Sequence, residues 1–580
     1  MTNSHQSLRL SQFILSQGPG SVLETPSGPV VISTLDKFFN SLGADYPPGR
    51  FEVTEQRLSQ NVLGGARIVR LPTNDEVGRP TAVWIYPTSQ FPQWAACTKH
   101  GATQVLYRAE NGCSRCGSMK DWDRKAKAGR ESIRFVRACE NGHLDDVDWN
   151  WFVHRKGGCS SKEFNWDGAG RSLRMSTLSC TKCTARINFG EMSARPLKCS
   201  GRRPEVGVES EETCDLPSRI AQRGASNLHV PVHQTALTLG EMSQRLHQLL
   251  NDSELRGRID DLIAEDELTE QRFRKKVEGE HVRISKGARQ ELRATPWETI
   301  LQAIREIFEL DGSRHNFGDN DPLRDAEFEF LKRAAVTGVP AVAARGHGSP
   351  PLIEIHQDEV RILAPPHSRL GLRVTPVNRL RVVIAQTGYE RMQGKATDIS
   401  FDHGASTWVP GVELFGEGIF VDCPGVEVPL PPERMAAWQG MPVDPKCETD
   451  PLFVWWHTLS HRLIRSLSLD SGYSSAAIRE RIYFSRSPSG ERTGGVLLYT
   501  VQPGGDGTLG GLVEMARRFE EVLAGALEDL ENCSNDPLCE ESELNNALGA
   551  VCYSCLLASE TSCEWRNRGL DRILLRDCIP

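Results

Sequence analysis

Three cysteines near one end of the chain have the spacing of zinc ligands, in the stretch Cys552-Tyr-Ser-Cys-Leu-Leu-Ala-Ser-Glu-Thr-Ser-Cys563. The two-residue gap between Cys552 and Cys555 lets a tight turn aim two thiolates at one tetrahedral metal ion. Cys563 follows further along and supplies a third thiolate. The stretch therefore predicts a small zinc-stapled module over residues 526–580.

Two further cysteines compete for the fourth ligand position of this module. Cys539 follows the turn Asn535-Asp-Pro537 and is our first choice, with Cys533 as the alternative. Residues 526–565 hold nine acidic residues and no Lys or Arg, and a zinc ion bound by four thiolates would add about two more negative charges. Because such a module repels a phosphate backbone, we expect it to contact protein rather than DNA.

A second group of cysteines lies in the first half of the chain. Nine of the 17 cysteines fall between Cys97 and Cys214, again with two-residue gaps. Their spacing predicts three sets of four ligands. The first set is Cys97, His100, Cys113 and Cys116; the second is Cys180, Cys183, Cys199 and Cys214; the third is Cys139, His143, His154 and Cys159. The alternative for each set is a group of buried, reduced cysteines.

The predicted sets favour zinc that holds structure over zinc that performs chemistry. Each set has four donors, so none leaves an open position for a catalytic water. A deaminase-type zinc would also need a His-x-Glu motif near its cysteine pair, and none is present. We therefore expect two or three structural zinc ions.

Two histidines, His457 and His461, stand one turn apart on a predicted helix from Leu452 to Leu469. This spacing can bind zinc, but the metalloprotease motif needs Glu directly after the first histidine, where this chain has Thr458. Because two tryptophans precede His457, we expect both histidines to be packed core residues. A zinc hydrolase built on them is the alternative.

Other catalytic motifs are incomplete. The run Gly505-Asp-Gly-Thr-Leu-Gly510 fits a dinucleotide-binding pattern, but no strand carrying an acid follows it, so we favour a tight strand-to-helix turn. The chain has no Gly-x4-Gly-Lys-Ser/Thr motif, which excludes ATP hydrolysis by the P-loop route. Glu413, Glu417 and Asp422 could bind Mg²⁺ in a nuclease. No nuclease motif accompanies them, and we interpret them as surface turn and strand residues.

The composition is that of a globular protein with several domains. The chain has 580 residues, of which 39% are hydrophobic and 25% charged, and its net charge is −8. It contains no apolar run long enough to span a membrane and no signal-peptide pattern. Its unmatched cysteines fit a reducing compartment, so we expect a cytoplasmic protein.

The charge is unevenly distributed along the chain. Residues 97–223 contain 23 Lys and Arg against 16 Asp and Glu. A basic excess can attract nucleic acid, although a solvated surface is the simpler interpretation. The candidate DNA-binding residues are Arg124, Lys125, Lys127, Arg130 and Arg134.

The distribution of helical and strand patterns predicts a multidomain α+β protein. Amphipathic helices are expected at Leu239–Leu250 and Trp297–Phe308, and a buried strand at Gly495–Val501. The predicted order is an N-terminal β-rich region (1–95), a cysteine-rich zinc-binding region (96–225), a helical insertion (226–345), a mixed α/β core (346–525) and the C-terminal zinc module (526–580).

Several longer motifs resemble one known family. They are Arg134-Phe-Val-Arg-Ala-Cys-Glu-Asn-Gly-His143, Leu380-Arg-Val-Val-Ile-Ala-Gln-Thr-Gly-Tyr-Glu-Arg391, Leu414-Phe-Gly-Glu-Gly-Ile-Phe420, Arg479-Glu-Arg-Ile-Tyr483 and the run from Cys552 to Arg572. Together they are similar to the DrmB family of DISARM anti-phage defence systems, which carries the zinc-binding domain of MrfA-type helicases. The likeness spans nearly the whole chain except the helical insertion. One departure is His100, where a cysteine is the commoner ligand.

The resemblance implies a component of an anti-phage defence system that has no motor of its own. The family pairs with DrmA, a helicase-like ATPase, which agrees with the missing P-loop. What the resemblance implies is therefore a non-enzymatic zinc protein that assists its helicase partner in recognising and loading foreign DNA. The alternative is a metal-dependent nuclease or zinc hydrolase that acts on phage DNA.

Overall fold

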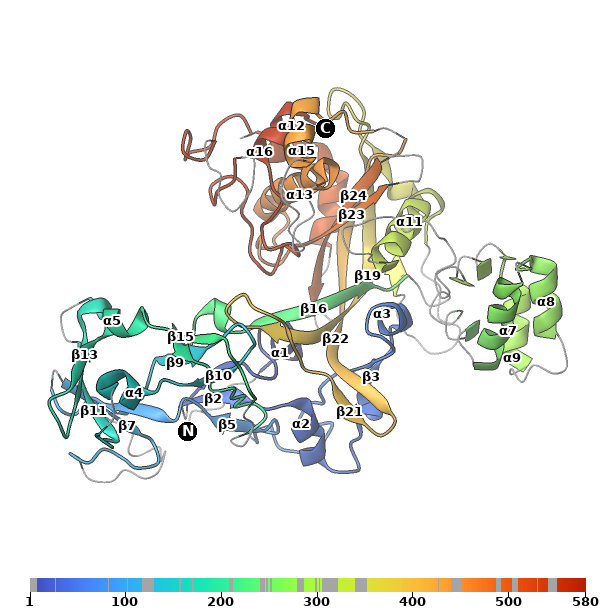
Figure 1. Ribbon diagram of the computed structural model, residues 1–580. Coiled ribbons are helices and arrows are strands. Elements are labelled where there is room, and N and C mark those ends of the chain that lie inside the picture. The colour runs from blue at the N-terminus through green and yellow to red at the C-terminus, as the bar shows by residue number, and fades with distance from the viewer. Residues whose placement is uncertain are drawn as a thin grey trace. The chain divides into compact units, whose positions relative to one another are not determined.

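The computed structural model describes most of the chain as a set of helices and strands (Figure 1). The described residues are 8–26, 28–81, 83–101, 103–116, 130–155, 158–168, 172–207, 212–239, 246, 249–250, 253–265, 267–278, 286–297, 300–301, 303–304, 322–339, 352–425, 427–439, 450–486, 492–502, 510–528, 530–540 and 550–580. The chain forms two compact units. The first comprises 1–54, 66–234 and 384–412; the second comprises 55–65, 235–383 and 413–580. Both contain helices and strands, so the expected multidomain α+β class is confirmed.

The first unit contains three small antiparallel sheets. The strand orders are β1-β2-β5, β10-β9-β15-β14 and β13-β12-β11-β7-β6-β8. Their strands are β1 (Val22–Thr25), β2 (Gly28–Ile32), β5 (Thr88–Gln90), β6 (Trp94–Cys97), β7 (Thr103–Arg108), β8 (Arg130–Ser132), β9 (Phe135–Ala138), β10 (Leu144–Asp146), β11 (Glu163–Asp167), β12 (Thr177–Cys180), β13 (Arg186–Asn188), β14 (Leu197–Lys198) and β15 (Pro217–Gln222). Strands of two to six residues bury little apolar surface each, which is typical of folds stapled by metal ions.

Short helices and further strands complete the first unit. The helices are α1 (Leu10–Ser16), α2 (Leu35–Leu42), α4 (Trp149–His154) and α5 (Phe189–Ser193). The additional strands are β3 (Glu52–Val53), β4 (Arg67–Val69), β20 (Thr397–Asp398) and β21 (Phe401–His403). Trp149 of α4 is fully buried against the aromatic side chains of the six-stranded sheet, such as Trp94 and Trp166. This aromatic cluster is the main apolar core of the cysteine-rich region.

The second unit is built on longer strands. The largest sheet has the order β16-β19-β22-β24-β23, with β16 (Val230–Leu237), β19 (Arg373–Glu390), β22 (Ser406–Asp422), β24 (Arg492–Gln502) and β23 (Arg479–Arg486). The boundary between the two units falls within β16, β19 and β22. Two short strands, β17 (Ile353–Glu354) and β18 (Arg361–Ile362), pair with β19.

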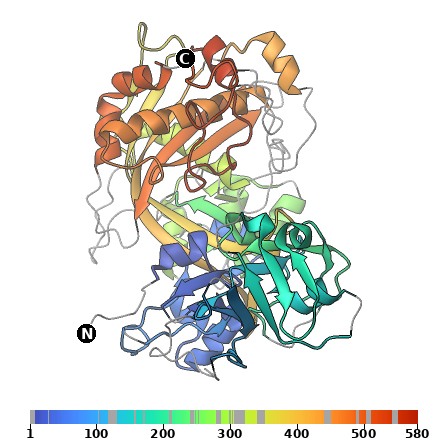
Figure 2. The ribbon, with the colours of Figure 1, turned by 90° about the vertical axis from the view of Figure 1, so that its left-hand side faces the viewer.

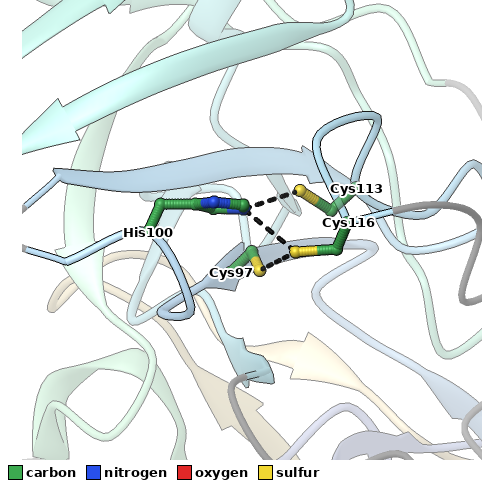
Figure 3. A group of neighbouring side chains, drawn as sticks. All are labelled: Cys97, His100, Cys113 and Cys116. Carbon is green, nitrogen blue, oxygen red and sulfur yellow. Dashed lines mark hydrogen bonds between the residues drawn. The ribbon is translucent and has the colours of Figure 1, made fainter.

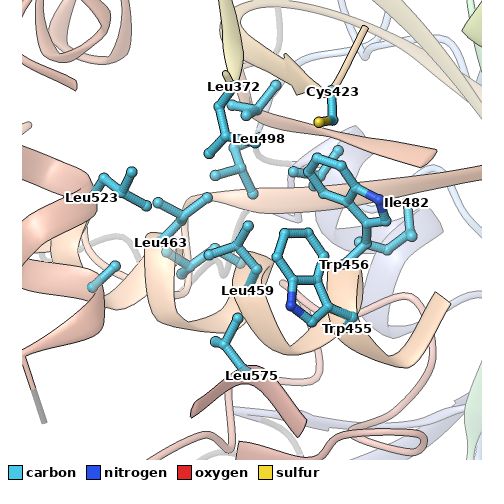
Figure 4. Packing of buried hydrophobic residues seen from close by; sticks show 14 of the residues in the cluster. Leu372, Cys423, Trp455, Trp456, Leu459, Leu463, Ile482, Leu498, Leu523 and Leu575 are labelled. Carbon is cyan, nitrogen blue, oxygen red and sulfur yellow. The ribbon is translucent and has the colours of Figure 1, made fainter. Parts of the chain in front are cut away.

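One long helix, α13 (Pro451–Asp470), organises the core of the second unit. It begins where Asp450 accepts a hydrogen bond from the backbone amide of Leu452 at 2.9 Å, with Pro451 in the first turn, which is a favourable position for proline. Leu459 and Leu463 of α13 face the sheet strands and pack among residues such as Leu498 (Figure 4). Figure 2 shows α13 crossing one face of this sheet.

The other face of the same sheet is covered by α11 (Pro322–Thr337). Phe328 of α11 stacks on Tyr483 of β23, whereas the neighbouring residues Ile482 and Phe484 belong to the cluster under α13. Because side chains alternate along a strand, the two helices lie on opposite faces. The remaining helices of this unit are α3 (Gln56–Asn61), α7 (Ser253–Ala264), α8 (Glu270–Glu278), α9 (Lys286–Ala294), α12 (Pro432–Gln439), α14 (Gly511–Arg517), α15 (Phe519–Leu527) and α16 (Arg572–Asp577).

The structure can be compared with the elements expected from the sequence. The predicted helix at Leu452–Leu469 and strand at Gly495–Val501 are confirmed as α13 and β24. Helices α7 to α9 lie in the segment expected to be a helical insertion and share a small apolar core. The helices predicted at Leu239–Leu250 and Trp297–Phe308 lie largely outside the described residues.

Candidate metal centres

Five groups of cysteine, histidine and acidic side chains come together within the described ranges of the chain, with the donor atoms of each group within 4.8 Å of one another. Their sulfur–sulfur distances include 3.6 Å between Cys97 and Cys116 and 3.4 Å between Cys533 and Cys552. A disulfide would need about 2.05 Å, whereas zinc bonds of about 2.0–2.3 Å in tetrahedral geometry place donors about 3.3–3.8 Å apart. The sulfur spacing therefore fits a shared metal ion.

The first group contains Cys97, His100, Cys113 and Cys116, the same four residues that the sequence grouped together (Figure 3). Cys97 ends β6, His100 lies in the turn to β7, and the other two cysteines follow β7. The Nε2 atom of His100 lies 3.3 Å from the sulfur of Cys113 and 3.1 Å from that of Cys116. The hairpin thus aims one imidazole nitrogen and three sulfurs at one point.

The structure groups the next eight donors differently from the spacing-based sets. One group is Cys139, His143, Cys199 and Cys214, and the other is His154, Cys159, Cys180 and Cys183. The cause is strand pairing. Strand β9 pairs with β15 through Ala138 and Arg219, which brings the residues after β9 beside those before β15. Strand β11 pairs with β12 through Phe164 and Cys180, which brings the segment before β11 beside the Cys180 pair.

The Cys139 group is held by a tight turn and an outer hydrogen bond. His143 Nδ1 lies 3.3 Å from the sulfur of Cys139, and its Nε2 lies 3.1 Å from Glu212. This is the arrangement in which a carboxylate orients a metal-binding histidine. Gly142 in the turn has φ +79°, and a Cβ there would lie 2.1 Å from Thr397 Oγ1, so only glycine fits. The Arg203 guanidinium, with help from His143, lowers the pKa of Glu212.

The His154 group is assembled from α4 and the β12–β13 turn. Asp148 caps α4 by accepting a hydrogen bond from the Trp151 amide at 2.9 Å. His154 Nδ1 contacts Asn150, and its buried Nε2 makes no hydrogen bond to the described residues. Such a nitrogen is available as a metal ligand. The sulfurs of Cys159 and Cys180 are 3.7 Å apart.

The C-terminal group contains Cys533, Cys539, Cys552 and Cys555. Both candidates for the fourth position therefore belong to it, and Cys563, which the spacing placed there, does not. Buried Arg572 donates a hydrogen bond to the carboxylate of Asp536 at 2.8 Å. Its positive charge lies near the thiols of Cys539 and Cys555. This offsets part of the negative charge of a four-thiolate site.

The fifth group joins Cys563 to His457, His461 and Glu480. The sequence interpretation placed the two histidines in the core as packing residues and did not include Glu480. One signal was present: Glu480 lies two residues from both Ile478 and Ile482 and so shares their apolar face, where a carboxylate needs a partner.

The donor chemistry of these groups fits zinc. Cysteine and histidine are the ligands of structural zinc sites. Burial raises the pKa of the Cys199 thiol to about 12 and that of the Cys555 thiol to about 11, so these two thiols become thiolates at neutral pH only when a cation replaces the proton. At Cys180 and Cys552 burial is outweighed by hydrogen bonds, such as those from the Lys182 amide and from Cys533, respectively, which together lower the pKa of each to about 6. The backbone amide of Gly201 also donates a hydrogen bond to the sulfur of Cys199 at 3.4 Å, and that of Lys182 donates to the sulfur of Cys180 at 3.2 Å. Among the cysteines that the structure describes, only Cys423 and Cys578 lie outside the five groups.

The three carboxylates considered for a nuclease do not converge. Glu413 accepts a hydrogen bond from Arg381 at 3.0 Å. Buried Glu417 accepts hydrogen bonds from the Tyr473 hydroxyl and from the backbone amide of Leu512. Asp422 forms an ion pair with the guanidinium of Arg373. Two of them are buried rather than on the surface, which corrects the expectation that they are surface residues.

The candidate DNA-binding residues fall mostly outside the described part of the chain. Arg124, Lys125 and Lys127 are not described, nor is the side chain of Arg130. Arg134 is exposed between β8 and β9. The motif Gly505–Gly510 also lies outside the described residues except for Gly510. No helix in the described ranges is both long and apolar enough to cross a membrane.

Comparison with known proteins identifies two family models in the chain. Residues 9–230 match a domain of unknown function (DUF8724), and residues 459–556 match the MrfA Zn-binding domain. The chain is also 28% identical over 532 residues to the DISARM protein DrmB of Bacillus paralicheniformis, with 84% of this chain and 88% of that protein covered. The resemblance inferred from the sequence is confirmed, and structural zinc is supported both by the domain match and by the donor groups.

Proposed function

From this likeness to DrmB we propose that the chain is a zinc-stapled, non-catalytic partner of a DrmA-type helicase-like ATPase in anti-phage defence. The observation that carries the proposal is the similarity to a DISARM protein along 84% of the chain. A likeness of that extent covers the units as a whole rather than one zinc module. The missing P-loop is consistent with a motor located on another chain.

The zinc ions in this proposal hold the scaffold. The four cysteine-rich groups each present four protein donors, the number that closes a tetrahedral site. We assign zinc to the groups of Cys97, Cys139, His154 and Cys533. In each of them the ion would add a cross-link to a part of the chain whose own apolar core is small.

Binding of foreign DNA is assigned to the cysteine-rich region rather than to the C-terminal module. The cysteine-rich region has an excess of basic residues, which attract a phosphate backbone. The C-terminal module has an excess of acidic residues, even without the negative charges of its cysteine thiolates. We propose that Arg124, Lys125, Lys127, Arg130 and Arg134 contact the phosphate backbone without sequence preference. Several other arginines are engaged internally; Arg481, for example, is buried against Glu327.

The experiment that tests the proposal is co-purification of the full chain with the helicase-like protein expressed with it, followed by ATPase assays. We expect a stable complex whose DNA-stimulated ATPase rate is higher than that of the helicase alone. Absence of a complex and of any change in rate would contradict the proposal. Replacing Arg124, Lys125 and Lys127 with Ala should weaken DNA binding and reduce its salt dependence, without loss of the complex.

The alternative function, a metal-dependent nuclease, makes a different prediction. Labelled DNA incubated with the chain and Mg²⁺, Mn²⁺ or Zn²⁺ should remain intact if the protein is a partner subunit. Cleavage that is lost in Glu417→Gln would instead establish the nuclease. The internal pairing of Glu417 with Tyr473 at 2.9 Å supports a structural role.

A further inference from the structure

We propose that His457, His461, Glu480 and Cys563 form an additional structural zinc site, separate from the four-cysteine site beside it. All four side chains are buried, with residue exposures of 0%, 3%, 0% and 3%. Their donor atoms converge from helix α13, strand β23 and the segment before α16. The MrfA Zn-binding domain match ends at residue 556 and begins at 459, so it includes neither Cys563 nor His457.

The distances between the donor atoms are near those of ligands around one zinc ion, and the two that involve His457 are slightly shorter. His457 Nε2 lies 3.0 Å from Glu480 Oε1 and 3.2 Å from the sulfur of Cys563. His461 Nε2 lies 3.4 Å from the same carboxylate oxygen. Donors around a tetrahedral zinc ion are about 3.3–3.8 Å apart at bond lengths of about 2.0–2.3 Å.

Hydrogen bonds at the Nδ1 atoms of the two histidines leave their Nε2 atoms, which point into the group, free to donate an electron pair to a metal ion. His457 Nδ1 contacts the carbonyl oxygen of Gly569 at 3.1 Å, and His461 Nδ1 contacts that of Leu556 at 2.7 Å. Since a carbonyl oxygen can only accept a hydrogen bond, Nδ1 of each ring carries the proton, and each neutral imidazole presents an unprotonated Nε2. Ser460 donates its hydroxyl to the outer oxygen of Glu480. These contacts are the usual supports of metal-binding side chains.

The interior of the group contains two enclosed polar atoms that make no hydrogen bond to the described part of the chain. Neither His461 Nε2 nor Glu480 Oε1 has a hydrogen-bond partner among the described residues, although both are enclosed. A proton on His457 would pair this ring with Glu480 and leave His461 Nε2 without a partner, and a proton on His461 would lie at 3.4 Å from the carboxylate oxygen, which is long for a hydrogen bond. A divalent cation satisfies all four donors, and with one thiolate and one carboxylate the assembly is neutral, which favours full burial.

The proposed site has a structural role rather than a catalytic one. Four protein donors fill a tetrahedral zinc and leave no position for water. The ion would tie α13 to β23 and to the C-terminal segment, through residues 106 positions apart in the case of His457 and Cys563. Cross-links that close long loops restrict the unfolded chain most.

Zinc content of the purified full chain tests the proposal. We expect Cys563→Ser and Glu480→Gln each to contain one zinc ion fewer per chain than the parent, measured by elemental analysis. Cys578→Ser is the matched control, because Cys578 is a buried cysteine outside all five groups, and it should keep the parental count. Folded variants with an unchanged zinc count would overturn the site.

A measurement on the unaltered chain covers the case in which the variants do not fold. With ¹¹³Cd in place of zinc, a site with one thiolate should resonate well upfield of sites with three or four thiolates. Presence of such a resonance supports the site, and its absence contradicts it. Binding of another divalent metal at this position, seen in the elemental analysis, would overturn the assignment to zinc.

Discussion

The guanidinium of Arg373 forms two parallel hydrogen bonds with the carboxylate of Asp422, at 2.8 and 2.5 Å, across neighbouring strands in the interior of the second unit. Both side chains are largely buried. The Asp422 carboxylate is therefore part of an internal ion pair and is not available to bind Mg²⁺. Burial raises the pKa of Asp422, while Arg373 opposes this effect.

Breaking this pair should be costly. Arg373→Met leaves a buried, uncompensated carboxylate, and we expect a loss of about 3–5 kcal/mol in unfolding free energy. The double variant Arg373→Met/Asp422→Leu replaces both charges with apolar groups and should recover most of the loss. Chemical denaturation of the parent, the single variant and the double variant measures their unfolding free energies. Equal destabilisation in the single and double variants would contradict the claim that the uncompensated carboxylate causes the loss.

Alkylation of cysteines can test whether Cys199 shares a zinc site with Cys139, as the structure places it, or with Cys180. In Cys199→Ser, we expect Cys139 and Cys214 to become reactive toward iodoacetamide, because their zinc site is incomplete. Cys180 and Cys183 should remain protected, since the structure places them with His154 instead. Mass spectrometry of alkylated peptides reads out each cysteine. Simultaneous exposure of the Cys180 pair would support the grouping by sequence spacing.

Cys555→Ser should unfold the C-terminal zinc module rather than remove an activity. Structural zinc binding is coupled to folding, so loss of one thiolate of four should cost several kcal/mol locally. Hydrogen exchange should accelerate in residues 550–571 and in the contacting part of α13, where Arg462 donates to the Cys555 carbonyl at 3.1 Å. Exchange identical to that of the parent would contradict a zinc-dependent module.

We expect the buried side chain of His229 to contribute to the pH dependence of the protein's stability. Burial, aided by Arg391, lowers its pKa to about 3, and its Nδ1 is enclosed without a hydrogen-bond partner in the described residues. Unfolded histidine titrates near 6.5. As pH falls from about 6.5 toward 3, the unfolded chain takes up a proton that the folded chain does not, so stability decreases.

The measurement is the melting temperature of the parent and of His229→Phe between pH 7.5 and 5.5. Phenylalanine keeps the stacking on Tyr389, whose ring lies 4.9 Å away, and removes the titration. We expect the variant to lose less stability on acidification. Identical slopes would mean that His229 is protonated to the same extent in the folded and unfolded states.

Sequence reasoning succeeded where the donors are local. The Cys97 group spans one hairpin, so spacing alone brought its four members together. It failed where sheet pairing decides proximity: Cys139 meets Cys199 because β9 and β14 both pair with β15. Register between strands distant in sequence follows from packing, and ligand spacing carries no information about it.

The same limit explains Cys563. It lies eight positions after Cys555 in the sequence, and this spacing predicted it as the third ligand of the module. The turn at residues 533–539 instead places Cys533 and Cys539 near the Cys552 pair. Residues 563–569 pass under α13, where His457 contacts both the Cys563 sulfur and the Gly569 carbonyl. Only the tertiary structure could identify Glu480 as the remaining neighbour.

The wide separation of these donors has a consequence for biosynthesis. His457 and His461 leave the ribosome some hundred residues before Cys563. Until then the sheet strands can cover one side of α13, but the side that carries the two imidazoles lacks the C-terminal segment that packs on it. The nascent chain is therefore most vulnerable to aggregation and to capture of the wrong metal during this interval. Zinc supply and chaperone protection during translation should matter more for this protein than for one whose ligands all lie within single hairpins.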